Sequence, residues 1–256
     1  MPRPRLFIFL ALISPLFASP AADQLALGNR ELAQGHGEAA IAAFEKAAAL
    51  APADSEPQRR LGDAYGFVAQ NSGMFTGLRL AKKVRASYEK AVALDPADLA
   101  ARQSLLDFYL MAPAMLGGGV DKATAQATAI RQLDPARSHL AFARVHVAAK
   151  DYADARRELD AALAATPDSY AVLYQLGRLA AITGEDVDRG VAALRKCLTL
   201  PPAPGAPGLE AAHWRLGNLR EKKSDRPAAR AAYEAALKLK PGFEEAAADL
   251  KRLGAP

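Results

Sequence analysis

Three consecutive glycines beside a lysine are the first feature of this sequence that could bind a phosphate. They lie in MLGGGVDK, where glycines 117–119 are followed by Asp121 and Lys122. The phosphate loop of nucleotide-binding enzymes has the spacing GxxxxGK[ST] and directly follows a buried strand. Here a helical apolar stretch precedes the glycines, Lys122 follows an aspartate, and the sequence has no strand-like run. We therefore predict a loose turn whose Asp121 caps the next helix.

The other reactive side chains show no arrangement typical of a metal site or a catalytic group. His139 and His146 are seven residues apart and could share a helix face, but no third ligand stands at a metal-ligand spacing. Cys197 is the only cysteine and cannot form a disulfide within the chain, and no serine has a G-x-S-x-G setting. The acidic residues fall on polar helix faces, as partners of Lys and Arg. We expect no enzymatic activity, no catalytic residue, no metal and no cofactor.

The composition of the chain is that of a helical globular protein. Of its 256 residues, 51% are hydrophobic and 24% are charged, and alanine, the strongest helix former, is abundant. The formal net charge is +5. Because the basic residues are dispersed, we do not expect nucleic acid as a partner, since that requires a concentrated basic face.

Residues 1–22 have the composition of a secretory signal peptide. Arg3 and Arg5 precede an apolar run over residues 6–17, and small residues suited to cleavage follow. The run is shorter than the roughly 20 residues that a membrane-spanning helix needs. We predict an exported protein, periplasmic or secreted, that is cleaved after Ala18 or Ala21 and then keeps no stable membrane span.

The rest of the chain repeats itself. The segment LGNRELAQGHGEAAIAAFEKAAALAPAD (27–54) aligns without a gap with LGNLREKKSDRPAARAAYEAALKLKPGF (216–243). The pairs Gly28/Gly217, Ala40/Ala229, Phe44/Tyr233, Ala47/Ala236 and Pro52/Pro241 coincide. This pattern resembles the tetratricopeptide repeat, a helix–turn–helix unit of about 34 residues. Its closing proline occurs six times, as Pro52, Pro96, Pro135, Pro167, Pro202 and Pro241.

The packing of two helices explains why small residues recur in each unit. Small residues on both helices let the two backbones approach closely, and one large side chain then fills the seam between them. The small residues of the first helix are Gly28, Gly62, Ala143, Gly177 and Gly217, with Leu106 as an exception. The seam residues of the second helix are Phe44, Tyr88, Leu159, Leu194 and Tyr233, with Ala127 as an exception.

The resemblance implies an all-α fold, a right-handed α-solenoid of about six units in residues 23–256. The units would span residues 23–54, 55–98, 99–137, 138–169, 170–208 and 209–242. A charged amphipathic segment over residues 243–253 suits a capping helix, which would close the last unit.

Two units exceed the repeat length at the turn between their helices. In the second unit we expect a longer loop and an early helix start with Thr76 as its cap. In the third unit the excess is the glycine turn. These extended edge loops, 70–84 and 111–121, carry Met74, Phe75, Met115 and Leu116. The four side chains either pack on one another and seal the edge, or they offer a partner an adaptable apolar surface.

The resemblance also implies a binding groove. In tetratricopeptide-repeat proteins the first helix of each unit lines a concave surface, mainly through its fifth and ninth positions. The matching groove residues here are Arg59, Asp63, Gln103, Asp107, Arg144, Tyr174, Arg178, Trp214 and Asn218. The paired lysines and asparagines with which some members of the family bind an acidic peptide C-terminus are absent.

These observations predict a non-catalytic scaffold of the cell envelope that binds a protein or peptide in its groove. One alternative is a structural or assembly component of an envelope complex that uses the edge loops instead. Another is an enzyme accessory subunit, or a binder of a small molecule near Tyr174 and Trp214. The sequence does not identify the partner.

Overall fold

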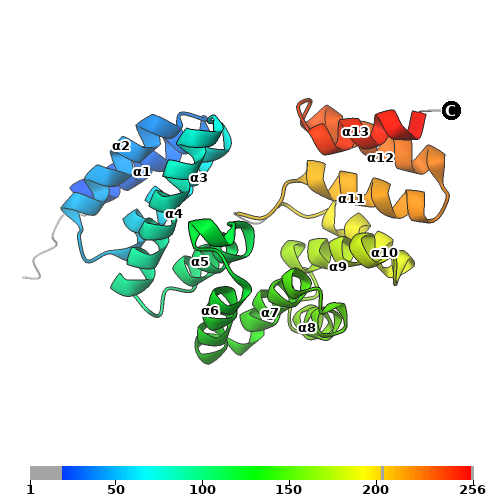
Figure 1. The fold of residues 1–256 in the computed structure, drawn as a ribbon, viewed down its shortest axis with the longest axis horizontal. Coiled ribbons are helices and arrows are strands. Elements are labelled where there is room, and N and C mark those ends of the chain that lie inside the picture. Colours follow the sequence, from blue (N-terminus) through cyan, green and yellow to red (C-terminus); the bar gives the residue numbers. More distant parts are fainter. Residues whose placement is uncertain (1–18, 203–204, 255–256) are drawn as a thin grey trace, which may run out of the picture. The chain divides into compact units, whose positions relative to one another are not determined.

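The computed structural model describes residues 19–202 and 205–254, and the regular elements in these ranges are all helices (Figure 1). The predicted all-α fold is therefore confirmed. The basic start and apolar run of the predicted leader lie outside the described residues. Among the residues described, no helix combines the length and the hydrophobicity needed to cross a membrane. The chain divides into two compact units, unit 1 (Met1–Asp95) and unit 2 (Pro96–Pro256).

The described part of unit 1 contains two helical hairpins. Helices α1 (Pro20–Ala33) and α2 (Gly37–Leu50) form the first, and α3 (Ser55–Gln70) and α4 (Met74–Leu94) form the second. The two hairpins pack on each other through α2 and α3. Helix α4 has 21 residues, whereas α2, its counterpart in the first hairpin, has 14.

Unit 2 contains four hairpins and a terminal helix in its described residues. The hairpins pair α5 with α6, α7 with α8, α9 with α10 and α11 with α12, and α13 packs on α12. The helices are α5 (Leu99–Met111), α6 (Val120–Leu133), α7 (Pro135–Ala149), α8 (Tyr152–Ala165), α9 (Tyr170–Thr183), α10 (Val187–Cys197), α11 (Leu209–Lys222), α12 (Arg226–Leu239) and α13 (Glu244–Gly254). A short 3₁₀ turn, η1 (Ala114–Leu116), lies between α5 and α6.

Most helices begin at a side chain that accepts a backbone N–H of the first turn. Ser19, Asp54, Asp98, Asp134, Asp151, Ser169 and Asp225 do so for α1, α3, α5, α7, α8, α9 and α12. Such caps satisfy donors that a helix leaves open. The two caps predicted from the edge loops are wrong. Helix α4 starts after Gly73 and helix α6 after Gly119, so that Thr76 and Asp121 lie inside the first turns.

The predicted seam between the helices is present in four of the hairpins, where a glycine of the first helix faces it. A Cβ added at Gly28, Gly62 or Gly217 would collide with the ring of Phe44, Tyr88 or Tyr233, and one added at Gly177 would collide with Leu194. The glycine Cα therefore lies directly against the seam side chain of the partner helix. These seam residues are buried, and the rings of Phe44 and Tyr233 have no exposed surface.

The exceptional third hairpin fills its seam from the opposite helix. Leu106 stands on α5 where the other hairpins have Gly or Ala, and Ala127 stands on α6 where they have a large side chain. Both residues are completely buried, and α5 packs on α6. The exchange of a large and a small residue keeps the volume of the seam, which a close-packed interior requires.

The glycine turn between α5 and α6 is folded on itself. Gly117 has a φ of 92°, and a Cβ at Gly118 would collide with the carbonyl group of Ala112. The Nζ of Lys122 donates to the carbonyl of Gly117 at 2.9 Å and lies over the ring of Tyr109. The lysine is therefore occupied in closing the turn, which is preceded by a helix as expected.

A methyl group at Gly62 tests the seam. We expect Gly62→Ala to lower the free energy of unfolding by about 1 to 3 kcal/mol, because the Tyr88 ring blocks the added carbon. Gly66→Ala, one turn further along α3, is the matched control. Its Cβ would stay 4.0 Å from the nearest atom, so helix propensity alone should act and stabilise by up to about 1 kcal/mol. Urea unfolding followed by circular dichroism compares the two, and equal effects would show that the seam accepts a methyl group.

Candidate functional site

The predicted groove residues of unit 2 come from α5, α7, α9 and α11, four helices of which each contacts the next. We call this set the first-helix face of unit 2, namely Gln103, Asp107, Arg144, Tyr174, Arg178, Trp214 and Asn218. The contacts of its members differ from one end of the set to the other, and they decide which side chains a partner could use.

Asp107 joins α5 to α7. Its carboxylate accepts a hydrogen bond from the Gln103 amide at 2.8 Å and forms an ion pair with the Arg144 guanidinium. Burial raises the pKa of Asp107 above its ordinary value, and Arg144 and Gln103 oppose this shift only in part. Arg144 and Asp107 therefore hold two repeats together, and the guanidinium is already paired with a carboxylate.

Arg178 on α9 is the basic side chain of the face that lacks such a pairing. It is partly buried, and its guanidinium donates to the Gln175 side chain at 3.2 Å. Among the described residues no carboxylate lies within ion-pair distance of it. Burial lowers the pKa of Arg178, and the positive charges of Arg215 and Arg144 lower it further. The partly desolvated guanidinium of Arg178 on α9 thus experiences the positive charge of Arg215 on α11, whereas Arg144 on α7 is paired with Asp107.

Tyr174 contributes little surface to a partner. Its side chain is buried with 5% exposure and stacks on Tyr170 one turn earlier, with ring centroids 6.5 Å apart and an interplanar angle of 8°. The hydroxyl of Tyr170 donates to the carbonyl of Pro207 at 2.7 Å, which ties the connector before α11 to α9. Tyr174 is therefore a core residue of α9.

Trp214 and Asn218 on α11 are bound by the terminal helix. The indole Nε1 of Trp214 donates to Asp249 Oδ2 at 2.8 Å, and the Asn218 amide donates to the same oxygen at 3.1 Å. The Trp214 ring packs edge-on against Phe243, with centroids 5.6 Å apart. The sequence placed both residues on the binding face, but their polar groups serve to dock α13.

Arg215 is a basic residue near Arg178 that was not predicted from the sequence. Its guanidinium lies 3.9 Å from the centroid of the Trp214 ring, and its buried Nε has no hydrogen-bond partner. Arg215 is at neither the fifth nor the ninth position of its helix. The repeat pattern therefore did not predict it as a groove residue. Only the charge beside the single tryptophan could have drawn notice.

The predicted residues of unit 1 form a closed network. Asp63 accepts the Tyr88 hydroxyl at 2.8 Å and pairs with Arg59 and Arg60 at 3.4 and 3.6 Å. Arg59 and Arg60 also approach Glu56. Burial raises the pKa of Asp63, against the effect of these donors. Each charge has a partner within the unit, which makes this network a link between α3 and α4.

Three of the four edge-loop side chains are exposed to solvent. Met74 and Phe75 are 76% and 86% exposed, and Met115 is 84% exposed, whereas Leu116 is buried. The interpretation that these four residues seal the edge is wrong for the first three. They remain available to a partner.

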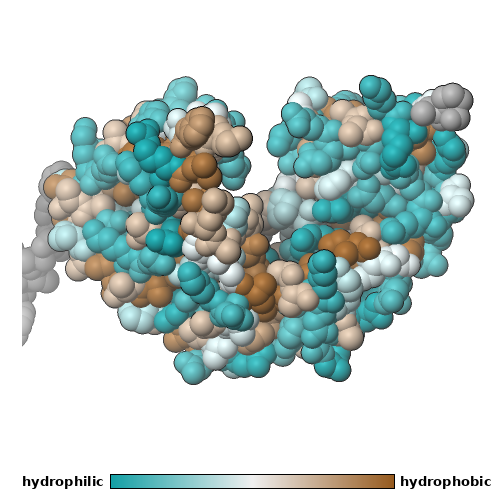
Figure 2. All heavy atoms as spheres, viewed as in Figure 1, coloured by the Kyte–Doolittle hydropathy of each residue, from teal (hydrophilic) through white to brown (hydrophobic). Residues whose placement is uncertain are grey.

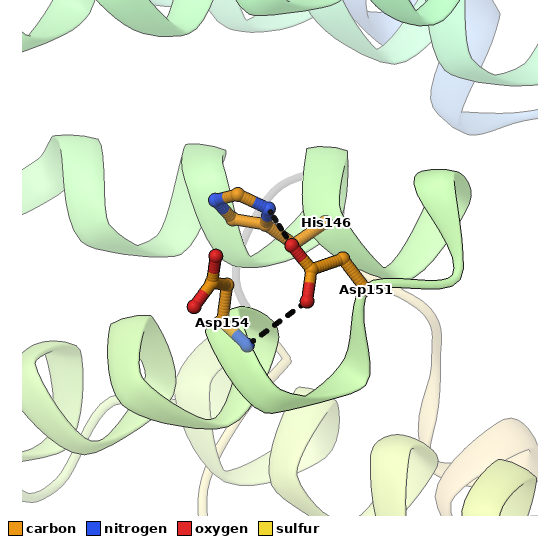
Figure 3. Close-up of side chains that lie close together, drawn as sticks. All are labelled: His146, Asp151 and Asp154. Atoms are coloured by element: carbon orange, nitrogen blue, oxygen red, sulfur yellow. Dashed lines mark hydrogen bonds and ion pairs between the residues drawn. The ribbon is translucent and has the colours of Figure 1, made fainter.

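One cluster has the composition of a metal site. His146 on α7 and Asp151 and Asp154 at the start of α8 bring ligand atoms within 4.8 Å of one another (Figure 3). Asp151 accepts the Asp154 backbone N–H as the cap of α8, and its other oxygen lies 3.4 Å from His146 Nδ1. Asp154 pairs with Arg157. These contacts account for the three side chains as a capping network between α7 and α8.

Cys197 is buried at the end of α10, as its small-residue position predicts. Burial raises the pKa of its thiol to about 11, and the sulfur lies 3.7 Å from the carbonyl oxygen of Tyr170. A thiol with this pKa is protonated at neutral pH, whereas a nucleophilic cysteine needs a lowered pKa. Its role is to fill the core between α9 and α10.

Comparison with known proteins agrees with the repeat. Residues 140–207 and residues 211–243 each match a sequence profile described as tetratricopeptide repeat. A tetratricopeptide repeat protein from Parabacteroides merdae superimposes with a TM-score of 0.70 at 15% identity, over 92% of this chain and 84% of that one. PilF of Pseudomonas aeruginosa gives a TM-score of 0.58 at 16% identity, over 91% and 97% of the two chains. No curated protein matches the sequence.

The chain is also similar in fold to part of a larger protein. The Cut9–Hcn1 assembly of the APC/C contains a chain that superimposes with a TM-score of 0.68 at 16% identity, over 94% of this chain and 43% of that one. At such low identities the likeness extends to the helical-repeat fold alone.

Asp107 on the first-helix face and Asp188 on α10 have opposite pKa shifts, and comparing them tests the effect of burial on the Asp107 carboxyl. Because the folded state raises the pKa of Asp107, its contribution to stability is largest at acid pH and is lost as the pH rises through the folded pKa. The stability of Asp107→Asn relative to the parent chain should therefore increase with pH. Exposed Asp188 has a lowered pKa, mainly through its hydrogen bond with Lys223, so Asp188→Asn should show the reverse trend.

Urea unfolding of the parent chain and both variants between about pH 3 and pH 7 measures these trends. If the stability of both variants relative to the parent changed in the same direction with pH, burial would not be the dominant influence on the pKa of Asp107.

Proposed function

Because the chain is a tetratricopeptide-repeat protein, we propose that it is a non-catalytic scaffold that binds a protein or peptide segment on the first-helix face of unit 2. Solenoids of this kind use their surfaces for extended contacts with other chains. Arg178 carries the proposal. Of the charged residues on this face, it alone has a partly buried guanidinium without a carboxylate partner in the described part of the chain.

An incoming carboxylate or backbone carbonyl would complete the contacts of Arg178. A guanidinium presents five N–H donors, and the Gln175 side chain takes only one of the directions they offer. The positive charge of Arg215, which forms no ion pair in the described part of the chain, makes the site more attractive to a negative group. Arginine in a desolvated setting is also a frequent interface hot spot. The buried Tyr170–Tyr174 pair fixes the helix that carries it.

A second candidate function rests on the exposed edge. Met115 is 84% exposed, and an assembly component that used the loop 111–121 would bury it against its partner. The two proposals place the contact at opposite kinds of surface, one charged and partly buried, the other apolar and exposed. An enzyme accessory role has no observation in its favour beyond the general one that repeat proteins bind other proteins.

We also propose that the protein acts after export, in the periplasm or outside the cell. The composition of residues 1–22 supports this proposal. The side chain of Ser19 accepts the backbone N–H of Ala22 at 3.2 Å and caps α1, which begins at Pro20. Cleavage after Ala18 would keep this cap, whereas cleavage after Ala21 would remove it together with the first two residues of the helix.

Replacing Arg178 should weaken the binding of the partner. Proteins retained by the immobilised parent chain from an envelope extract supply the partner, and calorimetry then measures its affinity. We expect Arg178→Ala to cost about 1 to 3 kcal/mol of binding energy while the helicity is kept. Arg195→Ala, on the exposed side of α10, removes the same charge from the same hairpin and should bind like the parent. Unchanged binding by Arg178→Ala together with loss in Met115→Ser would favour the edge instead.

The mature N-terminus should be Ser19. Cleavage after Ala18 keeps the capping hydrogen bond, which contributes about 1 kcal/mol to a helix. Mass spectrometry of the protein recovered from the periplasm or the medium of an expressing bacterium identifies the first residue. An N-terminus at Ala22 would show that the cap is dispensable, and an intact Met1 in the recovered protein would contradict the proposed leader.

A further inference from the structure

The first two turns of α4 extend beyond the repeat and expose apolar side chains. Met74 and Phe75 are 76% and 86% exposed, and Leu78 is 38% exposed. These are large values for side chains that cost free energy to hydrate. Hydrophobic residues are visible on unit 1 near the turn that joins α3 to α4 (Figures 1 and 2). The extension makes α4 seven residues longer than α2.

The exposed side of α4 continues from apolar to basic. Residues four apart share a helix face, so Met74, Leu78 and Lys82 form one row. Phe75, Arg79 and Lys83 form a second row beside it. The opposite side of the helix is buried through Leu80, Val84, Ser87, Tyr88 and Ala91. The apolar turns thus end in a basic turn about 6 to 12 Å further along the axis.

The charge of this segment has one sign. The sequence has no acidic residue between Asp63 and Glu89, whereas Arg79, Lys82, Lys83 and Arg85 lie in that interval. In the described structure Arg79 and Lys82 are exposed and take part in no ion pair within 4 Å. Lys83 lies over the Tyr65 ring, 4.8 Å from its centroid. The basic turn is therefore open to a negatively charged surface.

We propose that the start of α4 docks unit 1 on an anionic membrane surface. Met74, Phe75 and Leu78 would enter the boundary between headgroups and acyl chains, and Arg79, Lys82 and Lys83 would meet the lipid phosphates. With the start of α4 pointing toward the membrane, the basic turn would lie about 6 to 12 Å behind the inserted side chains along the helix axis, similar to the depth of about 5 to 10 Å to which interfacial helices bury apolar side chains. We call the six residues the α4 docking surface.

A membrane fits this surface better than an acidic protein does. The apolar side chains project from a helix end, so they suit a yielding apolar phase into which they can insert. The basic residues come after the apolar ones in both rows. In a membrane the phosphates likewise lie outside the acyl chains, so each group of side chains would meet its matching layer. A protein partner would need an apolar cavity bordered by acidic residues at the same depth. The proposal does not depend on the first-helix face of unit 2, which belongs to other helices.

Vesicle sedimentation tests the docking surface. The chain is used from Ser19 onward, because the apolar leader would itself bind lipid, and circular dichroism confirms that its helicity equals that of the full chain. Vesicles of phosphatidylcholine alone are compared with vesicles that contain about one quarter phosphatidylglycerol. We expect the chain to sediment with the anionic vesicles, to bind neutral vesicles at least about tenfold more weakly, and to dissociate as salt is added.

Two variants separate the apolar and basic contributions. Met74→Ser with Phe75→Ser should lower the partition coefficient on anionic vesicles by about tenfold or more, since both side chains lose their transfer into the interface. Exchange of the three bases for glutamine should also lower it by about tenfold or more, at up to about fivefold per base, and remove most of the salt dependence. The three bases are Arg79, Lys82 and Lys83.

Matched controls change the same properties elsewhere. Leu50→Ser removes an exposed apolar side chain of α2, which is 56% exposed. A second control exchanges three exposed bases on α1, α2 and α12 for glutamine, namely Arg30, Lys46 and Lys238. Both controls should sediment like the parent chain. No sedimentation of the parent chain, or an equal loss in the controls, would overturn the proposal. Binding to soluble polyglutamate through Arg79, Lys82 and Lys83, without sedimentation on vesicles, would assign the surface to an acidic protein and overturn it as well.

Discussion

The close approach of two helix backbones at a glycine is the contact on which four of the six hairpins in the described residues depend. Gly28, Gly62 and Gly217 leave room for an aromatic ring against the backbone of the first helix, and Gly177 leaves room for Leu194. Such a seam fixes the distance between the two helices, because even one added methyl group would collide with the side chain of the partner helix. The third hairpin reaches the same end with Leu106 and Ala127 exchanged. The hairpins therefore share the combined volume of the two residues in the seam, whereas the types of these residues differ.

The seam also determines which polar residues are left for binding. The residue after each small residue lies beside the seam, and a tyrosine in the seam binds it. The Tyr88 hydroxyl donates to Asp63, and Asn218 donates to the Tyr233 hydroxyl. In the hairpin of α9 and α10 the seam residue is Leu194, which has no polar group, and so Arg178 keeps unused donors. The availability of Arg178 is thus a consequence of core packing one helix away.

The sequence predicted the hairpins well and the site only in part. The small residues, the seam residues and the buried position of Cys197 follow from a spacing that recurs six times, so each copy supports the others. The contact of Trp214 and Asn218 with Asp249 joins residues more than thirty positions apart and occurs once, which no repeat pattern can reveal. Arg215 was missed because it does not stand at a groove position of the repeat. The starts of α4 and α6 were placed too late, because Gly73 and Gly119 begin these helices without a side-chain cap.

The two halves of the long helix α4 differ in how they pack. Its second half packs through Val84, Tyr88 and Ala91, the same positions that hold α2, and would form a complete repeat helix alone. The added turns bury Leu80 and leave Met74 and Phe75 in solvent, and they contain Gly77, which weakens a helix. Their apolar exposure is thus not required by the packing of the repeat. It has a physical purpose if another apolar phase covers it, and the basic residues directly behind it indicate that this phase carries negative charge at its surface.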